Sequence, residues 1–230
     1  MPVLAVDHGL PPVPAERLQA PALRARFASP PRWRPEVERE PKFSERPPAE
    51  AAVLLPLVQR QAGPTVLLTQ RTAHLPTHAG QIAFPGGKID PHDGSARAAA
   101  LREAHEEVGL HPRHVEVIGQ MPVYVTGSGF VVTPVVALVQ PPFALQPNPQ
   151  EVDAVFEVPL AFLMDPAHHR RHAFDWEGGQ RQWFSMPYEE TPPGTQAPVE
   201  RFIWGATAGM LRNLYRFLLA EEGAAALERT

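Results

Sequence analysis

The 230-residue sequence is 43% hydrophobic and 20% charged, which is enough apolar material for one well-buried globular domain with extensions. It contains no cysteine, so disulfides, thiolate catalysis and cysteine-ligated zinc are excluded. The formal net charge of −4 gives no electrostatic basis for nucleic-acid binding, and no apolar run approaches the 18 residues of a membrane span. Since the N-terminus also lacks a signal-peptide pattern, we expect a cytoplasmic protein that acts on a small molecule.

Residues 1–50 are dense in proline and contain one plausible helix, Ala15 to Phe27. We interpret this segment as an arm that either packs on the folded domain or crosses to a neighbouring subunit, so a monomer and a homodimer both stay open. The composition changes at Ala51, where apolar and β-branched runs begin. We therefore expect the domain proper to span residues 51–230.

Hydrophobic periodicity and turn residues predict the elements of this domain in chain order. They are strands at 52–58 and 65–69 with a hairpin turn at 61–64, a short strand ending at residue 84, a glycine turn at 84–87, a helix at 95–108, strands at 114–125, 130–139 and 152–158, a strand pair at 170–187 turning at Gly178-Gly179, and an amphipathic helix at 207–219. This order predicts an α+β protein in which a mixed sheet lies between helices, an α/β/α sandwich.

The predicted helix at 95–108 carries a cluster of carboxylates. Glu103, Glu106 and Glu107 are related by three- and four-residue steps, which places them on neighbouring positions of one helix surface. A divalent cation would remove their repulsion, and hard oxygen ligands suit Mg²⁺ or Mn²⁺. The alternative is a solvated acidic helix in which Arg102 simply pairs with Glu106. A core face is expected opposite the charges, made of Ala98, Leu101, Ala104 and Val108.

The pattern Arg102-Glu103-x-x-Glu106-Glu107-x-Gly109 resembles the end of the Nudix box, the loop-helix-loop motif of the Nudix hydrolases. The resemblance implies the Nudix fold and a cofactor of Mg²⁺ or Mn²⁺. It implies that Glu103 and Glu107 hold the principal metal ion, that Glu106 completes the cluster, and that Arg102 orients a carboxylate.

The loop before the helix departs from that pattern. If the box begins at Gly87, the loop from Lys88 to Gly94 is one residue longer than in the family, and Asp93 occupies the acidic position. Asp93 is equally well explained as an N-cap of the helix in competition with Ser95. A backbone carbonyl near Gly87 is expected to reach the metal ion.

A second resemblance concerns the substrate. Leu67 to Thr72, Gly80 and Phe84 to Gly87 follow the signature of the coenzyme A pyrophosphatases among Nudix hydrolases, without a gap. Thr72 replaces a small Ser or Ala, and Pro76 replaces an arginine. The resemblance implies cleavage of coenzyme A or its derivatives to 3′,5′-ADP and 4′-phosphopantetheine. Substrate contacts are expected from Arg71, Lys88, Gly86 and Gly87.

The run Phe202 to Gly209 also resembles the end of bacterial members of this family, and we interpret it as packing between a strand and the last helix. The general base is expected to be a carboxylate, either Glu106 or Glu151, because Nudix enzymes often place an acidic residue near the position of Glu151. Other candidates for the base are Asp153, Glu157, His74, His78 and His105.

Two other functions stay open. The first is hydrolysis of another nucleoside diphosphate derivative, such as ADP-ribose. The second is a non-catalytic Nudix module that binds a nucleotide, although such modules commonly lose carboxylates that are intact here.

Overall fold

The computed structural model describes residues 2–45, 47–74, 79–176, 179–192, 194–195 and 197–221. Eight strands of the described residues form the larger sheet. Five of them lie in the order β4, β3, β2, β8 and β6. The other three pair with members of this series: β5 with β2, β7 with β8 and β9 with β3. These strands are β2 (Ala49–Val58), β3 (Thr65–Arg71), β4 (Ile82–Ala83), β5 (Gly86–Lys88), β6 (Val115–Gln120), β7 (Tyr124–Val125), β8 (Phe130–Val139) and β9 (Val152–Pro159).

The sheet is mixed because β2 runs parallel to β8 and antiparallel to β3. The β2–β3 hairpin closes with the pairs Leu57–Val66 and Val58–Thr65, as the turn residues at 61–64 predicted. The first of the two long strands expected at 114–139 is interrupted. It forms β6 and β7, separated by residues 121–123, where Pro122 has no N–H to continue a ladder.

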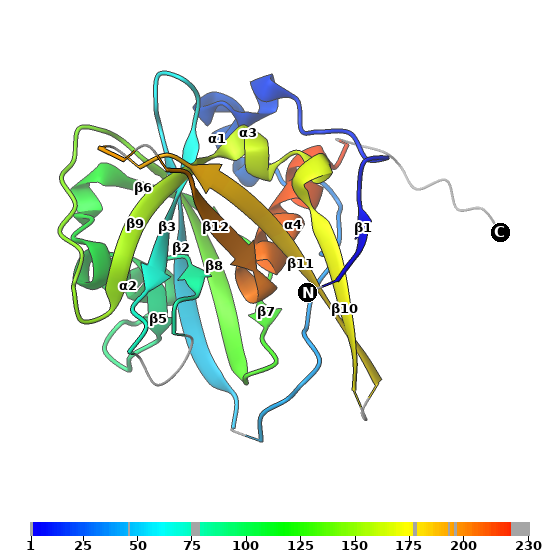
Figure 1. Ribbon diagram of the computed structural model, residues 1–230. Helices are drawn as coiled ribbons and strands as arrows, with labels where there is room; N and C mark the ends of the chain where they lie inside the picture. Colours follow the sequence, from blue (N-terminus) through cyan, green and yellow to red (C-terminus); the bar gives the residue numbers. More distant parts are fainter. Residues whose placement is uncertain are drawn as a thin grey trace.

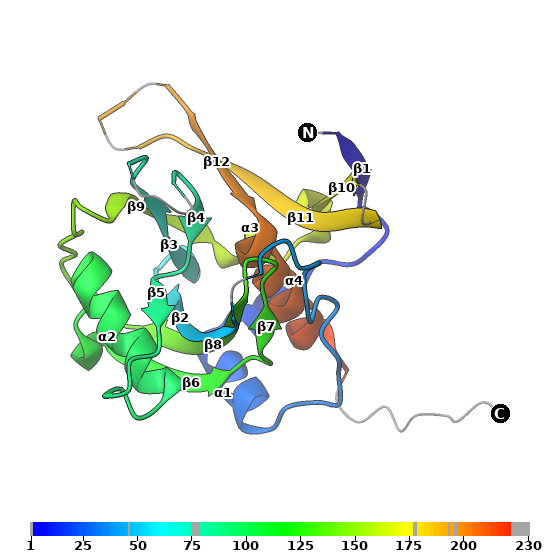
Figure 2. The ribbon, with the colours of Figure 1, turned by 90° about the horizontal axis from the view of Figure 1, so that it is seen from below.

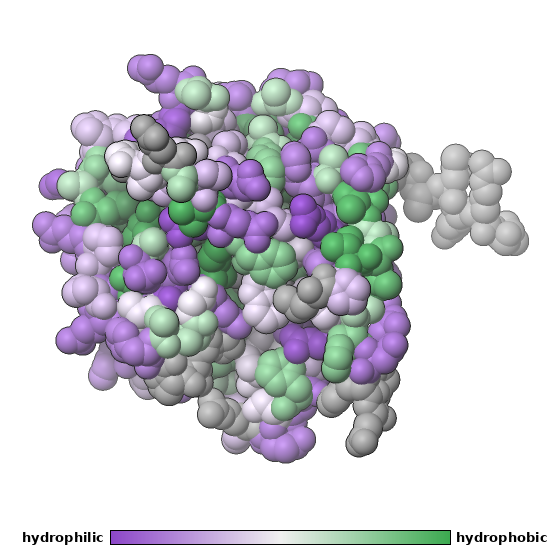
Figure 3. Space-filling model, in the orientation of Figure 1, coloured by the Kyte–Doolittle hydropathy of each residue, from purple (hydrophilic) through white to green (hydrophobic). Residues whose placement is uncertain are grey.

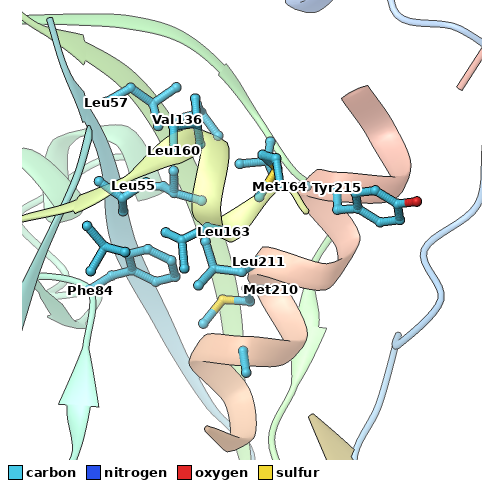
Figure 4. Close-up of a cluster of buried hydrophobic side chains, with 14 of the residues drawn as sticks. Leu55, Leu57, Phe84, Val136, Leu160, Leu163, Met164, Met210, Leu211 and Tyr215 are labelled. Carbon is cyan, nitrogen blue, oxygen red and sulfur yellow. The ribbon is translucent and has the colours of Figure 1, made fainter. Parts of the chain in front are cut away.

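Helices cover both faces of this sheet (Figures 1 and 2). Strand β2 reads as a nearly continuous apolar run because both of its faces are buried. One face packs with Leu54 against α2 (Ala96–Val108). The other face packs with Leu55 against α3 (Leu160–Leu163) and α4 (Gly205–Leu219), where Phe84, Leu163 and Leu211 meet (Figure 4). The predicted α/β/α sandwich is confirmed.

A second sheet contains β1 (Val3–Val6), β10 (Arg170–Trp176), β11 (Gly179–Glu190) and β12 (Val199–Trp204), in that order. Strand β1 belongs to the proline-rich arm and is an addition to the predicted elements. It is an edge strand whose Val3 and Leu4 are exposed, and apolar surface lies over it in Figure 3. Its four residues are too few to show a period.

The helix expected at 15–27 is split into a 3-10 turn (Ala15–Leu18) and α1 (Ala20–Ala28), with Pro21 in the first turn of α1. Two further 3-10 turns lie at Pro112–His114 and Pro166–His168. None of the described helices is long and apolar enough to cross a membrane.

The arm packs on its own domain through a buried charge cluster. Arg212 of α4 is fully buried and pairs with Asp7 and Glu36 of the arm, each at 2.8 Å. Arg171 of β10 and Arg216 of α4 also bind Glu36. Two arm carboxylates therefore neutralise Arg212, which the domain would otherwise bury without an acidic partner.

Candidate active site

Helix α2 begins and ends as the sequence predicted. The Ser95 hydroxyl accepts a hydrogen bond from the Ala98 amide at 3.1 Å, and Gly109 ends the helix in the left-handed conformation at φ 71°. The buried face differs from the expected one, because Ala98 and Leu101 are only partly buried. Its buried residues are Ala99, Ala100, Ala104, Glu107 and Val108.

Glu107 is buried against the glycine turn, with a side chain 6% exposed. One carboxylate oxygen accepts a hydrogen bond from the Gly86 amide at 3.0 Å, and the other lies 3.7 Å from Nη1 of Arg71. Burial, helped by the charges of Glu103 and Glu151, raises the pKa of Glu107 to about 7 despite these two contacts. A buried carboxylate with carboxylate neighbours is characteristic of a functional site.

Glu103 lies against the other glycine of the turn. A Cβ atom at Gly87 would come within 2.6 Å of all three atoms of the Glu103 carboxyl group, so only glycine allows this approach. Burial raises the pKa of Glu103, and Glu106 and Glu151 add to the effect, while Arg102 opposes it from 2.9 Å. Both predicted principal metal ligands therefore adjoin the Gly86-Gly87 turn.

Arg102 joins the helix to the preceding loop. It binds both oxygens of Asp93, at 2.8 and 2.9 Å, and contacts Glu103 and Glu106 at 2.9 Å each. Arg102 lowers the pKa of Asp93 to about 2. Asp93 is not the N-cap, since Ser95 has that place, and its carboxylate instead fixes Arg102. The Arg102–Glu106 pair of the solvated-helix interpretation is present, and Glu106 is 56% exposed.

Of the acidic residues near the start of β9, Glu151 is the one whose charge acts on Glu103 and Glu107. It raises the pKa of Glu103 and of Glu107, as described above. Its main-chain oxygen accepts a hydrogen bond from Thr72 at 3.0 Å, which ties it to the end of β3. Glu157 instead pairs with Arg60 and Thr65, and Asp153 is exposed.

The histidines are less suitable candidates for the general base than Glu151. His105 is exposed and meets the ring of His111 edge to face at 5.7 Å, away from the carboxylates. His74 is exposed. His78 and Pro76 lie outside the described residues.

The carboxylates fit a hard divalent cation by their chemistry. Among the described residues no three acidic or histidine side chains converge as a ready-made metal site, and Arg102 and Arg71 contact these carboxylates directly. Yet the charge of Glu151 raises the pKa of both Glu103 and Glu107, and that of Glu103 raises the pKa of Glu107, beside a turn that has no side chains. Oxygen donors that repel one another are the set that Mg²⁺ and Mn²⁺ bind.

A cavity of about 370 Å³ opens on the same turn. Its lining includes the four predicted substrate contacts, Arg71, Lys88, Gly86 and Gly87. Strands β4, β5, β8 and β12 and the start of α4 also contribute, and they lie close together in Figure 2. The structure therefore brings the predicted substrate residues together next to the carboxylates.

Other residues of this lining were not predicted. They come from the arm (Glu40 and Phe43), from β11 (Arg181) and from the junction of β12 with α4 (Trp204 to Thr207). The packing interpretation of the junction is correct for Gly209, where a Cβ atom would lie 2.4 Å from the Tyr124 hydroxyl. It is incomplete for Trp204, which is half-buried and faces the cavity.

Comparison with known proteins finds relatives of this chain. A relative from Shigella flexneri serotype 5b, named uncharacterized Nudix hydrolase NudL, is 44% identical over 182 residues, which is 79% of this chain and 86% of the relative. The NudL protein of Escherichia coli K12 is equally similar. The crystal structure of the Nudix hydrolase RenU from M. smegmatis is 28% identical, with a TM-score of 0.43, over 52% of this chain and 78% of that one.

A family model described as the NUDIX domain matches residues 48–185, more than half of the chain. The match contains the glycine turn, helix α2 and Glu151, and it begins at the end of the arm. This chain belongs to the Nudix hydrolase family.

Proposed function

We propose that this Nudix hydrolase cleaves the pyrophosphate of coenzyme A or its derivatives, in the presence of Mg²⁺ or Mn²⁺, to 3′,5′-ADP and 4′-phosphopantetheine. The observation that carries the proposal is the position of the cavity. Its cations, Arg71 and Lys88, adjoin the same Gly86-Gly87 turn that contacts Glu103 and Glu107. A phosphate anion held by the cations would thus lie next to the carboxylate cluster.

The cluster divides into residues with different tasks. Glu103 and Glu107 would hold the cation, with Glu106 completing the set and Arg102 orienting Glu103 through their 2.9 Å contact. When bound, the divalent cation supplies charge neutralisation at the pyrophosphate and lowers the pKa of the attacking water. Arg71 and Lys88 would bind phosphate oxygens, and Arg71 is suited to this because its Nη1 is only loosely paired, 3.7 Å from Glu107.

For the general base, the geometry favours Glu151 over Glu106. Glu106 is more than half exposed, and its carboxylate is already engaged by Arg102 at 2.9 Å. Glu151 has no ion pair among the residues that the structure describes and lies near Glu103 and Glu107. Asp153, exposed and two residues away, offers a matched control for any variant of Glu151.

The substrate is tested with the purified chain and Mg²⁺ on a panel of coenzyme A, ADP-ribose, NADH and diadenosine polyphosphates, with products identified by mass spectrometry. We expect the highest kcat/KM for coenzyme A, with 3′,5′-ADP as one product. A much faster turnover of ADP-ribose would replace the substrate assignment. Binding of these compounds without any product would show instead a non-catalytic module.

A further inference from the structure

The cavity contains a third cation, which the proposed function does not use. Arg181 of β11 lines it, with its guanidinium 4.7 Å from the centre of the Phe43 ring. Its Nη2 lies 3.5 Å from Glu40, and its buried Nε has no hydrogen-bond partner among the described residues. A guanidinium with unused donors on a cavity wall is suited to bind an anion.

Glu40 positions Arg181 without saturating it. One oxygen of Glu40 accepts a hydrogen bond from the Tyr124 hydroxyl at 3.0 Å, and the other accepts one from the Gly127 amide at 2.9 Å. The 3.5 Å contact with Arg181 is long for a charge-assisted hydrogen bond, which is usually about 2.7 to 2.9 Å. The carboxylate therefore holds the guanidinium in place and leaves most of its donors for a ligand.

The cations lie against two different parts of the cavity wall. Arg71 is adjacent to helix α2 through Glu107, and Lys88 belongs to the glycine-turn strand β5. Arg181 instead contacts Glu40 and Phe43 of the arm. The cavity thus offers one anion site beside the carboxylates and a second beside the arm.

We propose that Arg181 binds a second phosphate group of the substrate, the 3′-phosphate on the ribose, which is not part of the pyrophosphate that is cleaved. The inference deepens the proposed function and rests on it for the placement of the pyrophosphate at Arg71. Phe130 and Trp204 line the same cavity and offer aromatic surface to a base. The preferred ligand class is a nucleoside 3′-phosphate whose 5′-diphosphate is esterified.

Binding tests this inference without turnover. Calorimetry compares adenosine 3′,5′-bisphosphate with AMP, two ligands that differ only in the 3′-phosphate, on the unaltered chain and on Arg181→Met. We expect the unaltered chain to bind the bisphosphate about 10- to 100-fold more tightly, as for a hydrogen bond between charged groups. The Met variant should lose this ratio, and Arg181→Lys should keep part of it. Arg71→Met should weaken both ligands by a similar factor.

A kinetic comparison separates the inference from the function on which it rests. With coenzyme A and 3′-dephospho-coenzyme A as substrates, Arg181→Met should lower kcat/KM about 10- to 100-fold for the first and leave the second unchanged. Equal binding of bisphosphate and AMP by the unaltered chain would refute the role of Arg181, whatever is hydrolysed. Absence of coenzyme A hydrolysis would refute the proposed function, while the binding ratio would still report on Arg181.

Discussion

Replacement of Glu107 by glutamine should make the metal-free protein more stable and the enzyme much less active. Folding raises the pKa of Glu107 from 4.5 to about 7 because its carboxylate is buried. Between these two values the folded state keeps a proton that the unfolded state has released, so stability falls as the pH rises. Across 2.5 pH units the loss is about 3 kcal/mol, and it is complete above pH 7.

Glutamine keeps an acceptor for the Gly86 amide and removes the charge. We therefore expect Glu107→Gln in EDTA to gain about 2 to 3 kcal/mol at pH 8 and almost nothing at pH 4. For a chain of this size the gain at pH 8 is about 4 to 12 °C in Tm. With Mg²⁺ the variant should lose about 10²-fold or more in kcat, since a charged ligand is missing from the site.

Urea unfolding at pH 4 and pH 8 in EDTA, together with turnover in Mg²⁺, measures both effects. Glu106→Gln is the matched control, because Glu106 lies on the same helix but is 56% exposed, and its stability should change by less than about 1 kcal/mol. A Glu107→Gln protein that is no more stable than the unaltered chain at pH 8 would refute the burial argument. One that retains its turnover would refute the assignment of Glu107 as a metal ligand.

Three other substitutions probe different parts of the molecule. Gly87→Ala would push the Glu103 carboxylate by about 1 Å, so we expect kcat/KM to fall about 10²-fold and Mn²⁺ binding, followed by electron paramagnetic resonance, to weaken. Glu151→Gln should lower kcat about 10²-fold or more while the Kd for Mn²⁺ changes little, as expected for a base. Glu36→Gln removes one of the two negative charges that neutralise fully buried Arg212 and should destabilise the protein by on the order of 3 kcal/mol in urea, with kcat unchanged.

The helix of the site could be predicted because its signals are local. Ser95 and Gly109 mark its ends, and the carboxylates follow a helical spacing that needs no knowledge of the rest of the chain. The prediction was wrong about which face of the helix is buried. The periodicity of small residues left the buried face ambiguous by one position, so Ala98 was placed in the core, and Glu107 was expected on the charged face although it is buried against the glycine turn.

Elements that depend on partners were harder to predict. Strand β1 exists because β10 offers it an edge, and Val3 to Val6 alone carry no period. The charge cluster of the arm also depends on partners that are distant in the sequence. Arg212 looks like a surface residue of an amphipathic helix until Asp7 and Glu36 cover it from segments more than 170 positions away.

The residues expected to hold the cation follow a local sequence pattern, whereas the residues that line the cavity come from distant segments. The residues expected to hold a cation lie at short spacing on one rigid helix. They therefore form a single recognisable sequence motif. The wall of the cavity is assembled by sheet topology from Phe43, Arg71, Arg181 and Trp204, which share no spacing at all. Phe43 and Glu40 precede residue 48, where the family match begins. If Arg181 selects the substrate, the arm that holds it in place contributes to specificity, and two relatives with identical boxes can differ in substrate through segments outside the family domain.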